Sequence, residues 1–120
     1  MITGIHHAQI AIPKGREREA REFYCGLLGL KEVPKPPAQR ARGGLWLQVG
    51  DRQVHIGVED GVERKLTKVH IPYEVSDLAL WCKRLTDVGI GLLSGEQIPG
   101  HERFEFRDPF GNRVELIQRL

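Results

Sequence analysis

Residues 50–58 read GDRQVHIGV, and residues 111–118, close to the C-terminus, read GNRVELIQ. Each stretch opens with a Gly-Asp-Arg or Gly-Asn-Arg turn and continues into a short apolar strand, which is typical of the second half of a β-hairpin. The first copy has one extra residue, Gln53, and carries His55 where the second copy carries Glu115. A chain of 120 residues that repeats a turn and a strand in this way is predicted to contain two copies of one module.

The same order of elements surrounds both copies. In the first half, hydrophobic periodicity predicts one helix over 16–28 and strands over 4–13, 30–33, 45–49 and 53–59. In the second half it predicts one helix over 77–88 and strands over 67–75, 91–93, 103–107 and 113–118. Gly29 and Gly89 end the two helices 60 residues apart, so each half is predicted to be a βαβββ module. The segment 34–44 (PKPPAQRARGG) is predicted to be a loop, because proline cannot sit in a central strand.

One such module cannot bury both faces of its sheet alone. The sequence therefore predicts a single α+β domain over residues 1–120, with module 1 at about 1–60 and module 2 at about 66–120. We expect the two tandem βαβββ modules to form a cup-shaped mixed β-sheet with the helices outside. Concave surfaces of this kind are where small ligands usually bind.

Composition excludes several classes of function. The formal net charge is +2 with acids and bases interspersed, so no nucleic-acid partner is expected. No apolar run approaches the length of about 20 residues that spans a bilayer, and the first residues lack the features of a signal peptide. Cys25 and Cys82 are isolated, one in each half, which favours reduced thiols. We therefore expect a cytoplasmic protein without a membrane partner.

Apolar residues that alternate along a strand, or recur every three to four positions along a helix, are expected to form the core. In the helices these are Ala20, Phe23, Tyr24, Leu27, Leu28, Leu78, Leu80, Trp81, Leu85 and Val88. In the strands they are Ala8, Ile10, Ile12, Val54, Ile56, Val58, Val69, Ile71, Tyr73, Val75, Val114 and Leu116.

The same alternation places four metal-ligand side chains on the opposite faces of four strands. His7 in the first module corresponds to His70 in the second, and His55 corresponds to Glu115. Imidazole and carboxylate groups suit divalent Zn, Ni, Co, Mn or Fe, and two histidines with one carboxylate leave coordination positions open for a substrate. The sequence therefore predicts one divalent metal ion at His7, His70 and Glu115, with His55 as a fourth ligand or a close neighbour.

Other polar residues are candidates for contacts with a substrate. Gln9, Trp46, Gln48 and Arg107 share the parity of the predicted ligands, although exposed strand residues without a role would show the same pattern. His55 and Glu115 are the candidate catalytic residues, and the nearby alternatives for a base are Glu74 and Glu105. Arg40 and Arg42 lie in the loop rich in proline and glycine, where they could clamp an anionic ligand or be exposed arginines without such a role.

These residues lie in segments that resemble the vicinal oxygen chelate superfamily, which includes glyoxalase I, bleomycin-resistance proteins, fosfomycin-resistance thiol transferases and extradiol dioxygenases. The segments that carry the resemblance are GIHHAQIAIP with REFYCGLLGL, VHIPYEVSDL, and RFEFRDPFGNRVELI. The resemblance implies paired βαβββ modules and a divalent metal held by His7, His70 and Glu115. His55 departs from glyoxalase I, which has a glutamate at this place, so the type of reaction stays open.

The resemblance implies two classes of function. The first is a glyoxalase-like, metal-dependent enzyme whose small oxygen-rich or electrophilic substrate chelates the metal through two oxygens, in an isomerase, lyase, thiol-transfer or dioxygenase reaction. The alternative is a metal-free protein of the bleomycin-resistance type that sequesters a small molecule. Because modules of this family often pair across chains, we also expect a homodimer in which each site draws residues from both subunits.

Overall fold

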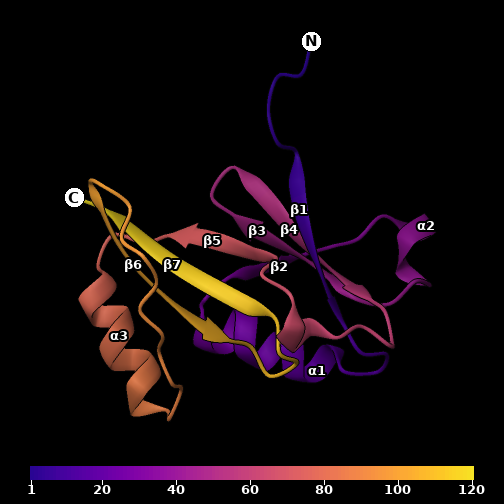
Figure 1. Cartoon of the computed structure of the whole chain (residues 1–120). Coiled ribbons are helices and arrows are strands. Elements are labelled where there is room, and N and C mark those ends of the chain that lie inside the picture. The colour runs from indigo at the N-terminus through magenta and orange to yellow at the C-terminus, as the bar shows by residue number, and fades with distance from the viewer. The chain divides into compact units, whose positions relative to one another are not determined.

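The computed structural model describes all residues from 1 to 120, which form two compact units, residues 1–63 and residues 64–120. Each unit contains one β-sheet with both parallel and antiparallel strand pairs, together with helical segments (Figure 1). The predicted α+β class is therefore confirmed, with one mixed sheet in each half of the chain.

The sheet of the first unit has four strands in the order β1–β4–β3–β2. Strands β1 and β4 are parallel, and the other neighbouring pairs are antiparallel. The bounds of the strands are β1 His7–Ile12, β2 Lys31–Val33, β3 Leu45–Val49 and β4 Arg52–Val58.

A continuous helical segment joins β1 to β2. It begins as α1 (Glu17–Ala20) and continues as a π-helix, η1 (Arg21–Leu27), which the periodicity did not predict. The predicted apolar stripe is confirmed, because Ala20, Phe23, Tyr24 and Leu28 are buried. The loop that follows β2 contains a further short helix, α2 (Pro37–Arg40), where we expected no regular structure; Pro37 stands in its first turn, the position at which proline favours a helix.

The sheet of the second unit has three strands in the order β5–β7–β6. Its elements are the 3-10 turn η2 (Arg64–Leu66), β5 (His70–Glu74), α3 (Leu78–Asp87), β6 (His101–Arg107) and β7 (Arg113–Arg119). Asp77 caps α3, since its side chain accepts a hydrogen bond of 3.0 Å from the backbone N–H of Leu80. α3 contacts β7.

The strand predicted over 91–93 is wrong, because only Leu93 forms a bridge, with Glu105 of β6. Gly91, Gly95 and Pro99 surround this bridge, and glycine and proline both weaken a strand. The second half is therefore an incomplete copy of the βαβββ module.

Three predicted core residues are exposed. Leu80 and Val88 on α3 are 60% and 59% exposed, because the ten-residue helix buries only the stripe that holds Leu78 and Leu85. Val69 is 77% exposed, since β5 begins only at His70 and the alternation does not extend to the preceding residue.

The two repeated turns both use a glycine with positive φ, and the second is also held by an aspartate. In the second, the buried Asp108 carboxylate accepts hydrogen bonds from the backbone N–H groups of Phe110 and Asn112, at 2.9 and 2.8 Å. Gly50 and Gly111 have φ values of +57° and +96°, which glycine adopts more easily than other residues.

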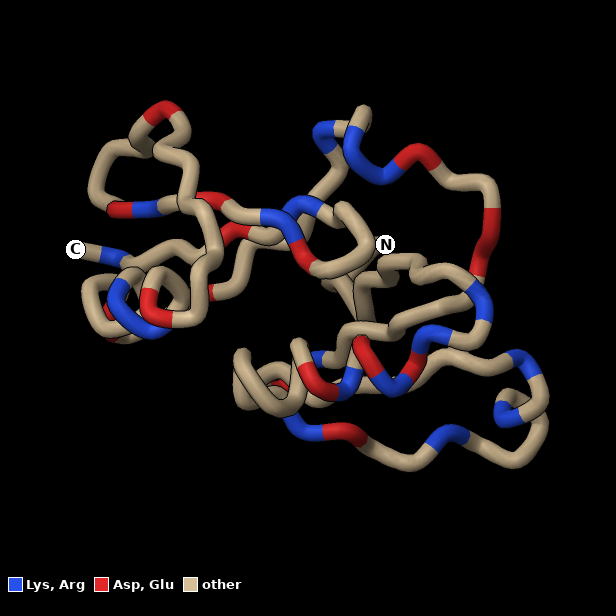
Figure 2. The backbone as a smooth tube through the Cα atoms, turned by 90° about the horizontal axis from the view of Figure 1, so that it is seen from below, with Lys and Arg blue, Asp and Glu red and all other residues tan.

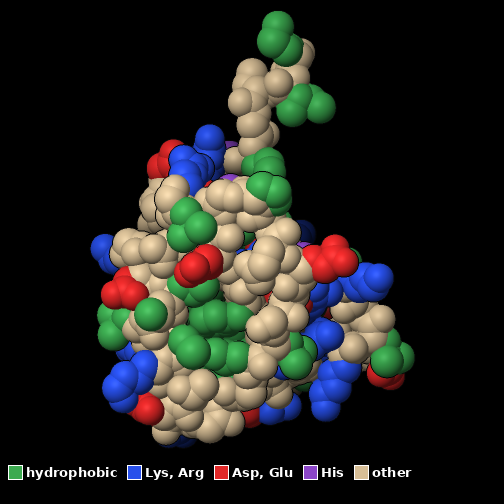
Figure 3. Space-filling model, turned by 60° about the vertical axis from the view of Figure 1, so that its left-hand side comes forward, with side chains coloured by type: hydrophobic (Ala, Val, Ile, Leu, Met, Phe, Trp, Pro, Cys, Tyr) green, Lys and Arg blue, Asp and Glu red, His purple; other side chains and the backbone are tan.

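Charged residues of both signs alternate along most of the chain (Figure 2). The segment 33–50 is an exception, with three cationic and no acidic residues. The first residues extend from the first unit, and Met1, Ile2 and Ile5 expose their apolar side chains (Figure 3). None of the helices has the length and apolar character that crossing a membrane would require.

Candidate functional site

The predicted ligands form two pairs, one in each unit, with the same register. In the first unit His7 lies opposite Gln53, two residues before His55, on parallel strands β1 and β4. In the second unit His70 lies opposite Arg113, two residues before Glu115, on parallel strands β5 and β7. The two pairs are therefore placed by the same local topology, as the repeat predicted.

The second-unit pair is in direct contact. The Nε2 atom of His70 lies 3.0 Å from Oε1 of Glu115, and its Nδ1 atom lies 2.8 Å from the backbone carbonyl of Lys68. Because a carbonyl can only accept, Nδ1 carries the hydrogen and Nε2 is directed at the carboxylate. Two atoms that both act as acceptors need a proton or a metal ion between them.

This geometry fits a divalent ion. Histidine ligands of metals usually donate their other ring N–H to a carbonyl or carboxylate, as His70 does to Lys68. The 3.0 Å separation of His70 Nε2 and Glu115 Oε1 is that of a hydrogen bond, and it places one imidazole nitrogen and one carboxylate oxygen side by side, which are donor types that divalent ions accept. Glu115 is only 3% exposed, so its carboxylate is held in place.

Arginine side chains surround the same carboxylate. Nη2 of Arg103 donates to Oε1 of Glu115 at 2.6 Å and also pairs with Glu105, which lies directly opposite Glu115 on β6. Arg113 pairs with both oxygens of Glu105. Hydrogen bonding by Arg103 holds the pKa of Glu115 below its ordinary value, and hydrogen bonding by Arg113 does the same for the pKa of Glu105.

The loop after α3 is shaped to receive Arg103. Nη1 of Arg103 donates to the backbone carbonyl of Glu96 at 2.8 Å, and a Cβ atom at Gly95 would lie 2.1 Å from the same nitrogen. Only glycine therefore allows the guanidinium to occupy this place beside Glu115.

The first-unit pair is arranged differently. The His7 and His55 rings are stacked with centroids 4.1 Å apart, and the ring of Trp46 stacks on His55 with a centroid distance of 4.0 Å. Nε2 of His55 lies 2.9 Å from Oε1 of Gln53, to which it can donate. Burial lowers the pKa of His55, and the nearby charges of His7, His6 and Lys35 lower it further. His55 is thus held as a neutral imidazole over a wider pH range than a free histidine.

His6 is a residue that the parity argument left out. Its Nδ1 atom lies 3.0 Å from Nδ1 of His7, and it lines the same hollow. Alternation along the predicted strand over 4–13 gives His6 the helix-facing parity of the core residues. That placement is wrong, because β1 begins only at His7 and His6 is exposed.

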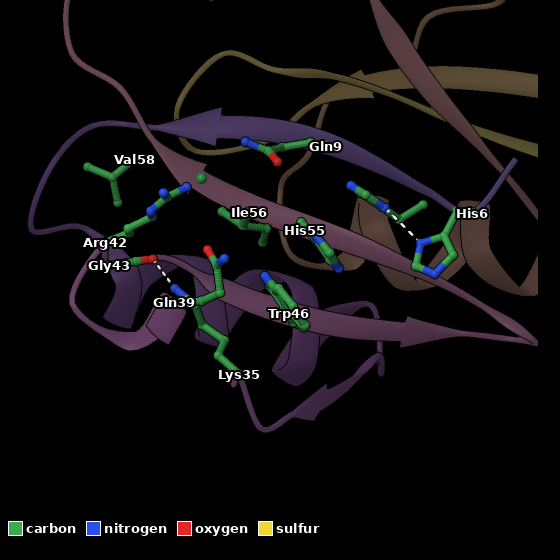
Figure 4. Close-up of a pocket in the computed structure, with 12 residues that line it drawn as sticks. His6, Gln9, Lys35, Gln39, Arg42, Gly43, Trp46, His55, Ile56 and Val58 are labelled. Atoms are coloured by element: carbon green, nitrogen blue, oxygen red, sulfur yellow. Dashed lines mark hydrogen bonds between the residues drawn. The ribbon is translucent and has the colours of Figure 1, made fainter. Parts of the chain in front are cut away.

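A hollow of about 440 Å³ lies over this face of the first sheet (Figure 4). Gln9 and Trp46, two of the predicted substrate-contacting residues, line it. Both are register partners of His55, one on β1 and one on β3. Gln48 lies outside the hollow, where its side-chain amide donates to the backbone carbonyl of Gly50 at 2.9 Å.

A second hollow, of about 370 Å³, lies in the second unit. Arg107, Glu105 and Arg113 line it together with the segment 93–95. Arg107 also donates to the backbone carbonyl of Gly111 at 3.1 Å. Glu74, the other candidate base, has a largely exposed side chain at the end of β5.

Neither unit by itself brings together three histidine, cysteine or acidic side chains around one point. Each supplies two of the four predicted donors, in the same register and on strands that correspond in the repeat. The imidazole and carboxylate of the His70–Glu115 pair are donor types that suit a divalent ion. The stacked His7 and His55 rings do not direct their nitrogen lone pairs to one point.

Residues 4–116 match the Glyoxalase/Bleomycin resistance protein/Dioxygenase superfamily, and the chain belongs to it. No curated protein sequence matches the chain significantly.

The chain is similar in structure to a protein from Bacillus anthracis assigned to the glyoxalase family. The two are 37% identical over 100% of this chain and 98% of the other, with a TM-score of 0.92. A fosfomycin resistance protein from Listeria monocytogenes, in complex with Mn(II) and a dihydroxypropylphosphonic acid, is 16% identical over 97% and 90% of the two chains, with a TM-score of 0.73. An antibiotic binding protein from Streptomyces is 19% identical over 100% of both chains, with a TM-score of 0.70. At these lower identities the likeness shows the fold alone.

Proposed function

We propose that the chain is a glyoxalase-like, metal-dependent enzyme that acts on a small oxygen-rich or electrophilic substrate. The observation that carries this proposal is the His70–Glu115 pair, with Nδ1 of His70 anchored on a carbonyl and Nε2 directed at a buried carboxylate 3.0 Å away. The superfamily resemblance and the Mn(II) held by the fosfomycin resistance protein support the choice of a divalent ion.

His70 and Glu115 are the proposed core of the metal site, and His7 is proposed as the third ligand because it takes the position of His70 in the repeat. A divalent ion bound there would act as a Lewis acid on a substrate that presents two adjacent oxygens. His55 would take up a proton from the substrate, since its imidazole is neutral and lines the hollow. Gln53 would hold the His55 ring in orientation during this step. Proton transfer by His55 favours an isomerase or lyase reaction.

Metal analysis tests this proposal. Protein purified without a histidine tag or chelator is expected to hold one divalent ion per chain, measured by elemental mass spectrometry. His70→Ala and Glu115→Gln are each expected to weaken the affinity by at least about 100-fold, because each removes a direct ligand. His101→Ala and Glu102→Gln on β6 are the matched controls and should keep wild-type affinity. Stoichiometric metal in the His70→Ala/Glu115→Gln double variant would refute the site.

One observation favours the second function, a metal-free binding protein. The Arg103 guanidinium already supplies a positive partner to Glu115 at 2.6 Å, so the carboxylate is neutralised without a metal ion. A wild-type protein that takes up no divalent ion, yet binds small molecules in the first-unit hollow, would identify this function. The metal analysis therefore separates the two candidates.

We also propose a homodimer with sites built from both subunits. Each sheet has an unpaired edge, at β1 in the first unit and at β5 in the second, and such edges favour pairing. Mixing His7→Ala protein with Glu115→Ala protein, followed by subunit exchange, should restore part of the metal binding, because one site of each heterodimer would be intact. Sites built within one chain would restore none, and a monomer in sedimentation at micromolar concentration would exclude the dimer.

A further inference from the structure

The hollow of the first unit has an unusual charge. Twelve residues line it, and among them are two permanent cations, Lys35 and Arg42, but no aspartate or glutamate. Both cations come from the segment 33–50, which has no acidic residue. In Figure 2 this part of the tube carries blue segments without red ones. The hollow therefore has a positive rim.

Lys35 is fixed at this rim by the backbone. Its side chain is half-buried, and its Nζ atom donates to the carbonyl oxygen of Gly43. No carboxylate pairs with the ammonium group, although its charge is close enough to help lower the pKa of His55. An ammonium held by one neutral acceptor keeps two of its three N–H donors for other partners.

Arg42 extends from the end of the same loop toward the strand that carries Gln9 (Figure 4). Arg42 forms no ion pair, which distinguishes it from Arg16, Arg18, Arg21, Arg103 and Arg113, all of which face a carboxylate. Arg40, predicted from the sequence as its partner, does not line the hollow and donates instead to the carbonyl of Lys35 at 3.2 Å. Lys35, and not Arg40, therefore lines the hollow together with Arg42.

The lining of the hollow is partly apolar. It includes Trp46, Ile56 and Val58, and the Trp46 ring is stacked on His55 at an interplanar angle of 0°. Gly57 leaves space for the Gln9 amide, since a Cβ atom at Gly57 would lie 2.5 Å from Nε2 of Gln9. Gln9 and Gln39 add neutral hydrogen-bonding groups to this lining.

We propose that the first-unit hollow binds a small organic anion, with its charged group held by Lys35 and Arg42 and a planar, unsaturated part against Trp46. This inference rests on the proposed function and deepens it, because it names the charge of the small molecule. Glu17 approaches Gly43 from outside the hollow, with Oε2 3.6 Å from where a Cβ atom would lie, but no carboxylate lines the hollow itself. Two cations and no carboxylate in the lining favour an anion over a neutral or cationic molecule.

Benzoate and its neutral analogue benzamide test the proposal on protein that has been stripped of metal with a chelator and then freed of the chelator. The indole N–H signal of Trp46 in ¹H–¹⁵N spectra reports binding, and Trp81 of the second unit is an internal reference. Benzoate should bind about tenfold more tightly than benzamide, and the difference should shrink at high salt. Lys35→Met and Arg42→Gln should each weaken benzoate binding about threefold to fivefold and leave benzamide unchanged.

Lys31→Met, which removes the same charge from a nearby position outside the hollow, is the matched control and should bind benzoate like the wild type. Equal affinity for the two probes, no saturable shift with benzoate, or unchanged benzoate affinity in both hollow variants would overturn the inference. His70→Ala should still bind benzoate, so a failure of metal binding and a failure of the anion site give different results.

Discussion

Replacement of Arg103 by Met is expected to lower the free energy of unfolding by about 3–5 kcal/mol. The Arg103 side chain is only 8% exposed and pairs with both Glu105 and Glu115, which face each other across β6 and β7. Without the guanidinium, two buried carboxylates would lie opposite each other, and like charges in this position destabilise a sheet. Methionine keeps much of the side-chain volume, so the loss reflects charge and hydrogen bonding.

Urea unfolding of the metal-free protein measures this loss, and Arg119→Met is the control, because the Arg119 side chain is 75% exposed. The double variant Arg103→Met/Glu105→Gln should recover part of the stability, since it removes one of the facing charges. An Arg103→Met protein as stable as the control would show that the two carboxylates do not need Arg103.

The stability lost in the Arg103→Met variant is also expected to depend on pH. The pKa of Glu105 in the folded chain is lowered from its ordinary value of 4.5, mainly by hydrogen bonding to Arg113 and then to Arg103. Its ionised form stabilises the folded state above about pH 4.5, and this contribution is lost as the pH falls, because the unfolded chain takes up the proton more readily. Arg103→Met should therefore lose less stability than the wild type between about pH 5 and 3.

Gly44→Ala is expected to destabilise the first unit by about 3 kcal/mol or more. Gly44 has a φ of +78°, and a Cβ atom there would lie 2.0 Å from the backbone carbonyl oxygen of Ile56. Because that oxygen belongs to β4, the strand itself would have to move, and the register of β3 with β4 would be disturbed.

Gly50→Ala is the matched control for this prediction. Gly50 also has a positive φ, of +57°, but an added Cβ atom would have no neighbour within 4 Å. Gly50→Ala should lower the free energy of unfolding by about 1 kcal/mol, which is the contribution of the backbone conformation alone. Thermal or urea unfolding of both variants measures the difference, and equal losses would show that the close approach at Ile56 is relieved without loss of stability.

The amino-acid sequence by itself determined the repeat, the order of most elements and the strand pairing that places His7 near His55 and His70 near Glu115. These predictions rest on local rules. Alternation along a strand decides the face of His7, His70 and Glu115, and the Gly-Asx-Arg turns fix where the hairpins reverse. The same rules failed at residues 91–93 and at Val69, where the periodic segments are short and glycines or chain ends weaken the pattern.

Only the tertiary structure decided which side chains meet. Arg103 reaches Glu115 because Gly95, eight residues away, leaves room for its guanidinium, and no spacing in the sequence signals this contact. Lys35 replaces Arg40 at the first-unit hollow because the short helix α2 turns the loop and Gly43 accepts from the ammonium group. Periodicity reports which face of an element a residue takes, whereas the direction of a long, flexible side chain depends on the space and the charges that distant segments place around it.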